Sequence, residues 1–578
     1  MQIKFTEVFD PSSINKTEPL YLDVETHKDD YTDIRLVQLY QTHWGQVQVL
    51  DTNLYDILDI YNIIKDCHVV AHNYGFEANC FSNDCRLYRN PFKKFSDTFL
   101  LARLEAWKLD AFNLAEVSKH FHGEDYYARL GVKKEFQKSF LDTAKSNKRA
   151  EPISFEQKQY AALDVLVMPK IYEACKHWED HFLVKLDYRV IDYILTWQYN
   201  GLPVDPKKWK EAKAFALGEI ARTQEVLGKL NVNSFKQVRA FLGGVDASDD
   251  SALAQLIDKK VHGAAEIRDQ RKYVKQLNFL DRYNKPRVRG YYYPRTISGR
   301  TASDCDNLQQ IPREMKSLFG CEDEFIVHAD YAALELRGIC CIVEERVLEK
   351  LFREGEDLHK YAASNIYKKP SAEITKFERL IGKFANFTLG YGAGPSRFKE
   401  MLMKEAGIFI SEAEARAIVK GWKEGFPAIK RWHLQNNDKY NRGVPYDTTL
   451  SGRNYKAKLY TDLNAIKIQG SCAEAFKLAM NYLGKKNYPI MNAVHDSFLI
   501  RAKTLEEARQ TGHDMAKAMI VAWFEVFKQS GIPDLPMPTD AEIGKNWKEI
   551  DQGNAIEVIS YAGTYEEYLT LKEEVAQW

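Results

Sequence analysis

Short apolar runs alternate with stretches of helical spacing through the first third of the chain. The apolar runs are residues 21–24, 35–40 and 68–71. Strands that alternate with helices are typical of an α/β domain, and we place this domain at residues 1–180.

The pattern changes twice further along. Residues 181–290 show long helical periodicity and are rich in Lys, Arg and Gln, which predicts an elongated helical subdomain. A segment punctuated by Gly and Pro, RGYYYPRTISGRTASD, then opens a second α/β body. We expect this body to be interrupted by helices between about 340 and 440 and to resume to the end. The fold class we predict is therefore α/β multidomain.

Composition narrows the class of protein. The chain has 578 residues, 45% of them hydrophobic, enough for several cores. Lys+Arg and Asp+Glu both number 81, so any surface that binds nucleic acid must be local. The start lacks an apolar signal core, and no run approaches the roughly 18 apolar residues of a membrane span. We expect a soluble intracellular protein without a membrane partner, and the nine scattered Cys indicate neither a disulfide framework nor a zinc site.

The N-terminal third carries a candidate metal site. Asp23 and Glu25 stand two apart in an apparent strand, so both side chains leave the same face. Tyr160 and Asp164 stand four apart on one face of a helix, and Glu77 lies between the two segments. Carboxylates of this kind suit Mg²⁺ or Mn²⁺, and two ions could promote attack of water, oriented by Tyr160, on a phosphodiester. A lone D-x-E is usually a solvated acidic pair, whereas the ordered set is much more specific.

A second pair of carboxylates comes from distant segments. Asp330 ends an apolar run that we interpret as a buried strand. His495 and Asp496 lie between two apolar runs, which predicts a β-hairpin with Asp496 at its tight turn. Aspartate is common in such turns for purely local reasons, but two Asp residues delivered to one sheet would form a metal site.

The segment between these two carboxylates favours the metal site over a purely local role for the aspartates. Arg379, Lys383, Phe387 and Tyr391 fall on every fourth residue, so two cations and then two rings share one helical face. Such a face can hold a triphosphate and stack against a base or sugar. Gly392 is expected to cap the helix. A core helix with two snorkelling cations is the plainer alternative.

Ordered motifs identify the family resemblance. The N-terminal set resembles the DEDDy class of 3′→5′ exonucleases, which implies a ribonuclease H-like fold. It departs from that class at Glu77, where Asp is usual. The rest resembles family A DNA polymerases in DYAALELR (motif A), R-x3-K-x3-F-x3-YG (motif B) and HDS (motif C). SGRTASDCDNLQQIP, EDLHKYAA, TLSGRNY and IQGSCAEA are further matches.

The resemblance implies a right-handed polymerase. Its thumb would be residues 181–290, its palm 291–340 and 441–578, and its fingers 341–440. It would bind primer-template DNA and dNTP substrates, with two Mg²⁺ ions, or Mn²⁺, in each active site.

Family roles transfer to matching positions. Asp330, Asp496 and Lys383 would be catalytic for polymerisation and Tyr160 for degradation. Asp330, the Tyr331 carbonyl and Asp496 would bind the polymerase metals, whereas Asp23, Glu25, Glu77 and Asp164 would bind those of the exonuclease. The dNTP-binding residues would be Arg379, Lys383, Phe387, Tyr391, Glu335 as steric gate, and His359. The DNA-binding residues would be Arg300, Asn307, Gln309, Gln469 and His495.

Other expectations concern the biological setting. Ser497 departs from the usual HDE of motif C, where a carboxylate would lie near the metals. Because no 5′-nuclease domain fits before Asp23, we expect a phage-type replicative enzyme. It would act as a monomer in the cytoplasm of an infected bacterium, with a processivity factor or replisome proteins as possible partners. Whether it copies a modified base is open. Two alternatives are a dedicated exonuclease with a DNA-binding C-terminal half, and a noncatalytic DNA-binding scaffold.

Overall fold

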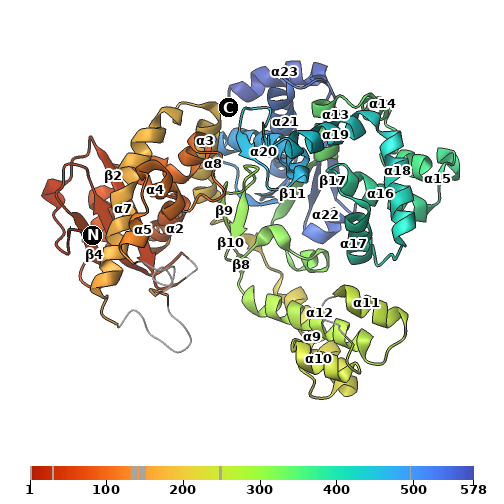
Figure 1. The fold of residues 1–578 in the computed structure, drawn as a ribbon, viewed down its shortest axis with the longest axis horizontal. Helices are drawn as coiled ribbons and strands as arrows, with labels where there is room; N and C mark the ends of the chain where they lie inside the picture. The colour runs from red at the N-terminus through yellow and green to blue at the C-terminus, as the bar shows by residue number, and fades with distance from the viewer. Residues whose placement is uncertain (1–2, 29–30, 132–138, 142–150, 246–249, 495) are drawn as a thin grey trace.

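Two β-sheets organise the computed structural model, which describes residues 3–28, 31–131, 139–141, 151–245, 250–494 and 496–578. In Figure 1 the N-terminal sheet and its helices lie on the left and the second sheet lies near the centre. A group of helices lies on the right, and another projects below. The predicted α/β multidomain fold is confirmed.

The N-terminal sheet has six strands in the order β1-β4-β3-β2-β5-β6. Strand β2 is antiparallel to β3 and parallel to β5. Successive residues of β2 face opposite sides, because Tyr21 packs in the core that includes helix α7, whereas Leu20 and Leu22 pack with α1 and α2. The strands are β1 (Phe5–Thr6), β2 (Pro19–Thr26), β3 (Ile34–Tyr40), β4 (Val47–Asp51), β5 (His68–Ala71) and β6 (Lys94–Asp97).

Helix α7 covers one face of this sheet and packs on β2, β3, β4 and β5. It begins at a capping box, in which Ser154 and Gln157 satisfy each other's backbone N–H groups. The helices here are α1 (Ile57–Ile64), α2 (Gly75–Asp84), α3 (Thr98–Glu105), α4 (Leu114–His122), α5 (Tyr126–Arg129), α7 (Phe155–Cys175) and α8 (Phe182–Trp197).

The lower projection in Figure 1 is a group of four helices in which α9 and α12 pack side by side. It has a small core of its own around Leu227, Leu253 and Ile267. The helices are α9 (Pro206–Leu227), α10 (Phe235–Phe241), α11 (Asp250–Asp258) and α12 (Ala264–Arg282), and the short strands at its base are β7 (Leu202–Pro203) and β8 (Arg287–Val288).

The second sheet is antiparallel, in the order β14-β15-β11-β16-β17. Asp330 on β11 stands opposite Ser497 on β15 and Asp540 on β16. Helix α21 packs on β11, β15 and β16 and against α20. The elements are β11 (Phe325–Tyr331), α20 (Tyr460–Lys485), β14 (Ile490–Val494), β15 (Ser497–Ala502), α21 (Leu505–Phe527), β16 (Thr539–Gly544), α22 (Trp547–Asp551), β17 (Glu557–Tyr561) and α23 (Tyr565–Ala576).

The right-hand helices in Figure 1 follow β11 in the chain. They are α13 (Leu334–Val343), α14 (Arg346–Glu354), α15 (Leu358–Tyr367), α16 (Lys376–Leu389), α17 (Pro395–Ala406), α18 (Glu412–Gly425) and α19 (Pro427–Asn441). Two hairpins complete the body: β9 (Tyr291–Tyr293) with β10 (Ala302–Asp304), and β12 (Tyr446–Thr448) with β13 (Asn454–Lys456). Within the described residues, no helix has the length and apolar character needed to cross a membrane.

The N-terminal domain packs closely on the β9–β10 hairpin. A Cβ added at Gly75, the first residue of α2, would lie 2.2 Å from the ring of Tyr293. The Tyr293 hydroxyl donates to Asp97, whose carboxylate also accepts the backbone N–H groups of Asn73 and Tyr74. One buried aspartate thus joins the turn before α2 to the second half of the molecule.

Candidate active sites

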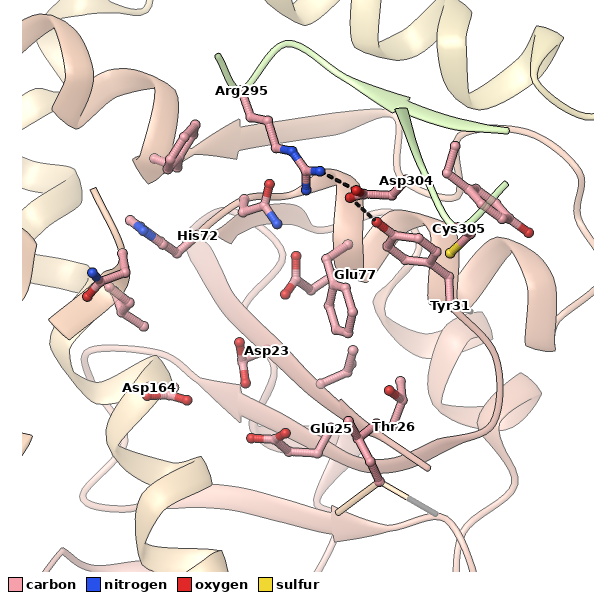
Figure 2. Close-up of a pocket in the computed structure, with 18 of the residues that line it drawn as sticks. Asp23, Glu25, Thr26, Tyr31, His72, Glu77, Asp164, Arg295, Asp304 and Cys305 are labelled. Carbon is pink, nitrogen blue, oxygen red and sulfur yellow. Dashed lines mark hydrogen bonds and ion pairs between the residues drawn. The ribbon is translucent and has the colours of Figure 1, made fainter. Parts of the chain in front are cut away.

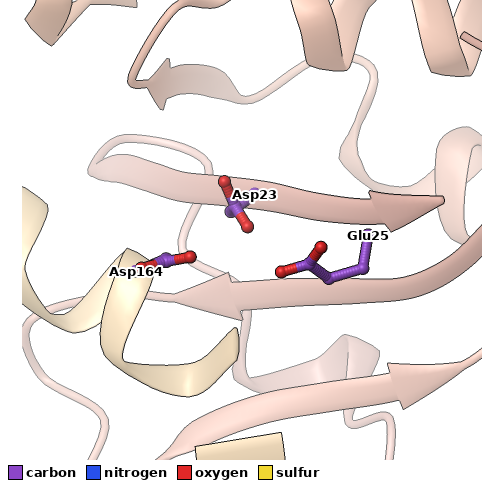
Figure 3. A group of neighbouring side chains, drawn as sticks. All are labelled: Asp23, Glu25 and Asp164. Atoms are coloured by element: carbon purple, nitrogen blue, oxygen red, sulfur yellow. The ribbon is translucent and has the colours of Figure 1, made fainter. Parts of the chain in front are cut away.

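Three carboxylates converge on the N-terminal sheet. Asp23 and Glu25 come from β2, on the face that α7 covers, and Asp164 comes from α7 (Figure 3). One ligand oxygen from each lies within 4.8 Å of the others, the only such group of three or more acidic, His or Cys side chains in the described part of the chain. We call these residues the exonuclease cluster, after the resemblance. The predicted strand and helix spacings are confirmed at this point.

Burial and mutual repulsion dominate the electrostatics of the cluster. Burial raises the pKa of Asp164 to about 7. It also raises the pKa of Asp23 and Glu25, to which the charge of Asp164 adds. The Tyr127 hydroxyl donates to Asp164 Oδ1 over 2.7 Å and partly stabilises the ionised form. Such a cluster holds protons near neutrality unless a cation replaces them.

Glu77 lies beside the cluster but is not one of the three converging carboxylates. It belongs to α2, and burial followed by the charge of Asp23 raises its pKa. Its Oε2 is buried and has no hydrogen-bond partner among the described residues. An unpartnered buried oxygen next to three carboxylates fits a hard divalent cation, which prefers oxygen ligands. Tyr160 also lines the same cleft.

A cleft of about 1450 Å³ opens over the cluster (Figure 2). Its acidic wall comes from the N-terminal domain, and much of the opposite wall comes from residues 282–306. Tyr31 closes the upper part of the cleft, where its hydroxyl donates to Asp304, which also pairs with Arg295. The basic residues that line the opposite wall are Arg282, Lys285, Arg287, Arg289 and Arg295. The cleft therefore places cations across from the carboxylates, as a bound polyanion requires.

The second pair of carboxylates lies at one end of the strands of the antiparallel sheet. Asp330 is at the end of β11, and Asp496 lies in the turn between β14 and β15, as predicted. The Tyr331 N–H donates to the Asp496 carbonyl over 3.4 Å, which fixes the two segments side by side. His495, expected to bind DNA, is outside the described residues.

Desolvation raises the pKa of Asp330 to about 6, although this side chain reaches the surface. His328 opposes the shift, and the charges of Asp496, Glu542 and Asp540 add to it. Burial likewise raises the pKa of Asp496. Glu542 and Asp540 both come from β16, and the motifs gave no indication of them. They add negative charge on the β16 side of Asp330, whereas Ser497, which faces Asp330 on β15, carries no charge.

Helix α16 presents Arg379, Lys383 and Phe387 along one face, and Phe387 is 47% exposed. Tyr391 was expected on the same helix, but α16 ends at Leu389. The reason is tertiary: Tyr460 donates to the Gly392 carbonyl and Asn464 to that of Tyr391. Tyr391 still lines a cleft of about 450 Å³ with Lys383 and Phe387.

The side chains of this region are paired with one another. Arg379 Nε donates to Asp357 Oδ2 over 2.6 Å. Glu335, at the start of α13, accepts from both Arg300 and the Tyr391 hydroxyl. The partner Asp357 was missed from the sequence, although it stands within the EDLHKYAA segment.

The remaining predicted residues are spread around this site. His359 lies 5.9 Å from the Phe387 ring, centroid to centroid, and burial lowers its pKa to about 4. Asn307 caps a short 3-10 turn, and Gln309 donates to the Ala493 carbonyl. Gln469 stands on α20, where its side chain contacts Tyr391. The structure thus places Asn307 and Gln309 in roles that stabilise the fold next to β14.

Comparison with known proteins agrees with this division. Residues 208–549 match the family model for DNA polymerase family A, and residues 11–177 match that for a 3'-5' exonuclease. DNA polymerase I of Aquifex aeolicus is 27% identical over 91% of this chain and 95% of its own length. DNA polymerase I of Borreliella burgdorferi is 26% identical over 83% of this chain, which spans 56% of that protein.

A solved structure shares the fold. It is described as the POL domain of Pol1 from M. smegmatis in complex with DNA primer-template and dNTP. The TM-score is 0.69 at 18% identity, over 92% of this chain and 96% of that one. The family match covers more than half of the chain. The chain therefore belongs to DNA polymerase family A and is a DNA-directed DNA polymerase with a 3′–5′ exonuclease domain at its N-terminal end.

Proposed function

We propose that this enzyme extends a primer along a DNA template with dNTPs and removes mispaired 3′ ends at a separate site. The observation that carries the proposal is the presence of two acidic sites on two different sheets of one chain. The related solved structure, described as a complex with primer-template and dNTP, supports DNA and dNTP as partners.

The polymerase site is proposed at Asp330, the Tyr331 carbonyl and Asp496. When bound there, two Mg²⁺ ions would neutralise phosphate charge and favour attack by the primer 3′-OH. Lys383 and Arg379 would bind the triphosphate, and Lys383 would protonate the leaving pyrophosphate. Because Asp357 holds only Nε of Arg379, the triphosphate would bind the guanidinium beside that carboxylate or replace it.

Selection of the nucleotide is assigned to the other residues of this region. Glu335 would occupy the space of a ribose 2′-OH, and Phe387 and Tyr391 would pack against sugar and base. His359 would support the triphosphate side of the site. Arg300 and Gln469 would contact the minor-groove edge of the new pair, where every correct pair offers similar acceptors.

The exonuclease site is proposed at Asp23, Glu25, Asp164 and Glu77. Divalent cations held there would stabilise the charge that develops when a phosphodiester is hydrolysed. Tyr160 would orient the attacking water, and the basic opposite wall would bind the strand's phosphates.

We also propose that the chain divides into exonuclease, thumb, palm and fingers, and that Mg²⁺ is its cation. It would replicate DNA in a phage-infected bacterium, with a processivity partner. A phage origin is supported by 26% identity to the DNA polymerase of Bacillus phage SP01, which covers 44% of this chain.

Primer extension on a fluorescent primer-template, with and without dNTPs, tests the proposal. We expect elongation with dNTPs and shortening without them. Shortening of the primer without any elongation would indicate a dedicated exonuclease. The absence of both reactions would indicate a noncatalytic DNA-binding scaffold.

A further inference from the structure

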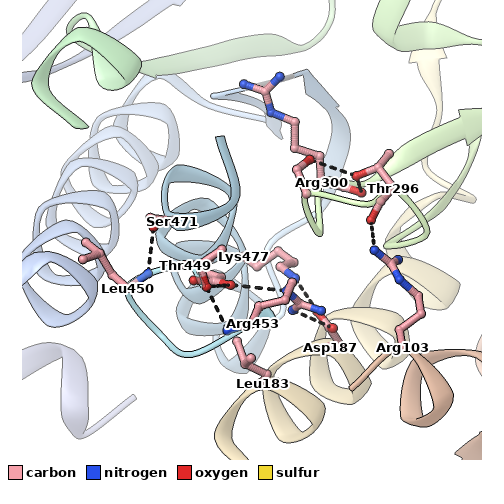
Figure 4. A network of polar contacts seen from close by, with 12 residues as sticks. Arg103, Leu183, Asp187, Thr296, Arg300, Thr449, Leu450, Arg453, Ser471 and Lys477 are labelled. Atoms are coloured by element: carbon pink, nitrogen blue, oxygen red, sulfur yellow. Dashed lines mark hydrogen bonds and ion pairs between the residues drawn. The ribbon is translucent and has the colours of Figure 1, made fainter. Parts of the chain in front are cut away.

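A five-residue turn, 296–300, lies between the exonuclease domain and the polymerase site (Figure 4). Arg103, in the last turn of α3, reaches out of the exonuclease domain, and its Nη2 donates to the Thr296 carbonyl. The contact joins residues 193 positions apart in the chain.

The turn transmits this contact to Arg300 through its own hydrogen bonds. The Gly299 N–H donates to the Thr296 carbonyl over 2.9 Å. Thr296 Oγ1 donates to the Arg300 carbonyl over 2.9 Å. A shift of Thr296 therefore shifts the backbone of Arg300.

The Arg300 side chain then enters the polymerase site. It donates to Glu335, which also accepts from the Tyr391 hydroxyl. Three consecutive hydrogen-bonded steps thus connect Arg103 to the proposed sugar-selecting residues.

A buried ion network also packs against the turn. Arg453 pairs with Asp187 on α8 over 3.1 Å and with Glu474 on α20 over 3.3 Å. A Cβ added at Gly299 would lie 2.9 Å from Arg453 Nε, so the turn packs tightly against this network.

Packing alone does not explain a buried arginine at position 103, because burying its charge is unfavourable. It is 7% exposed, and its Nη1 has no hydrogen-bond partner among the described residues. Its guanidinium lies 5.5 Å from the Phe99 ring and 5.9 Å from that of Phe112, both of which line the exonuclease cleft. An apolar residue would fill this space without burying a charge. The specific contribution of the guanidinium is its bond to Thr296.

We propose that Arg103 is a positioning residue for polymerisation: a side chain of the exonuclease domain holds the 296–300 turn, and with it Arg300 and Glu335, in the geometry that binds the incoming dNTP. This inference rests on the proposed function of the polymerase site. It makes the exonuclease domain a structural part of that site in addition to its own activity.

The test compares full-length variants. Arg103→Met removes the donor and keeps an apolar stem, Arg103→Lys keeps a donor, and Thr296→Val removes the Oγ1 bond to Arg300. Lys176→Met is the matched control, because Lys176 is a half-exposed cation of the same domain that pairs only locally with Glu173. Steady-state dNTP incorporation, degradation of a single-stranded oligonucleotide and hydrogen exchange of residues 294–302 are measured for each.

For Arg103→Met we expect KM for dNTP to rise about 5- to 20-fold, with kcat and single-strand degradation within about threefold of the unmodified enzyme. Arg103→Lys should recover most of the loss. Amide exchange in residues 294–302 should increase in Arg103→Met and Thr296→Val but not in Lys176→Met. Because the two residues act in series, the double variant should lose less than the product of the single losses.

Three results would overturn the inference while the unmodified enzyme is active. They are an unchanged KM, an equal loss of both activities, and failure of Arg103→Lys to improve on Arg103→Met. Lack of extension by both the unmodified enzyme and Lys176→Met would instead reject the proposed function. If Arg103→Met does not fold, unchanged exchange in Thr296→Val and Arg103→Lys relative to the unmodified enzyme, with unchanged KM, would also overturn it.

Discussion

The exonuclease cluster and the polymerase site handle negative charge in different ways. In the exonuclease cluster, like charges converge from one strand and one helix, and an oxygen of neighbouring Glu77 has no partner among the described residues. In the polymerase site, the substrate-binding side chains are already paired, Arg379 with Asp357 and Glu335 with Arg300.

This difference indicates two ways to prepare a site for phosphate chemistry. The exonuclease cluster is assembled by the fold and requires counter-charge to relieve repulsion. The polymerase site also gathers carboxylates, at Asp330 and Asp496, but it holds its substrate-binding side chains in internal pairs. We therefore expect the first site to respond mainly to cations and the second to be sensitive to substitutions that alter pairing.

The largest expected effect comes from Asp330→Ala. Loss of a shared metal ligand should reduce primer extension by about 10³-fold or more. Degradation of single strands should persist, because the exonuclease cluster stands on a different sheet. Gel-based extension and degradation assays measure both, and substantial extension by this variant, or by Asp496→Ala, would contradict the assignment.

Asp23→Ala combined with Glu25→Ala should have the converse effect. We expect degradation of a labelled single strand to fall by about 10²- to 10³-fold, with extension within about twofold of the unmodified enzyme. If the unmodified enzyme degrades no strand with Mg²⁺ or Mn²⁺, the exonuclease cluster is not a working site.

Sugar selection should change by intermediate amounts. Glu335→Ala opens space for a 2′-OH, and Phe387→Tyr supplies a hydroxyl where a dideoxynucleotide lacks one. Each should relax its own selection by roughly 10- to 100-fold, equivalent to about 1–3 kcal/mol for one hydrogen bond in a desolvated site. The effects should be independent, because Glu335 contacts Arg300 and Tyr391 whereas Phe387 packs near His359.

Single-nucleotide incorporation of dNTP, ddNTP and rNTP by each variant measures these selections. The unmodified enzyme serves as the control and should discriminate against both analogues. Equal use of ddNTP and dNTP by the unmodified enzyme would show that Phe387 does not lie at the sugar.

The smallest effect concerns stability and pH. Folded Asp164, with a pKa of about 7, retains a proton that the unfolded chain, near 3.8, has lost. Its contribution to stability is therefore present at low pH and lost as pH rises through about 7. Without divalent cations, we expect this titration to make the exonuclease domain melt several degrees lower at about pH 8 than at about pH 5.

Added Mn²⁺ should raise the melting temperature more at about pH 8 than at about pH 5, because protons compete for the carboxylates. Scanning calorimetry at both pH values measures this, with an Asp23→Asn, Asp164→Asn variant as control. An equal Mn²⁺ shift in the control would show that the cation binds elsewhere.

Local spacing sufficed to predict the groups that one element delivers. Asp23 and Glu25 leave one face of β2, and the turn containing Asp496 lies beside Asp330. The end of α16 could not be predicted, because hydrogen bonds from Tyr460 and Asn464, far along the chain, fix the backbone at residues 391–392.

Pairings between elements also escaped prediction. Asp357 and Arg379 lie on neighbouring helices, and no spacing rule relates them. Asp97 caps helix α3 with one carboxylate oxygen, and its second oxygen accepts the Tyr293 hydroxyl from the other half of the molecule. Family motifs predict which residues carry the chemistry, but they do not predict the residues that hold those side chains in place.

The contact of Gly75 with Tyr293 limits how the two halves can be recombined. An exonuclease domain transplanted from a relative with any larger residue at this position would collide with the tyrosine ring, since even a methyl group lacks room. Chimaeric enzymes should therefore tolerate the exchange only when both sides of this contact are transferred together. The two halves of the chain are expected to have diversified as a matched pair.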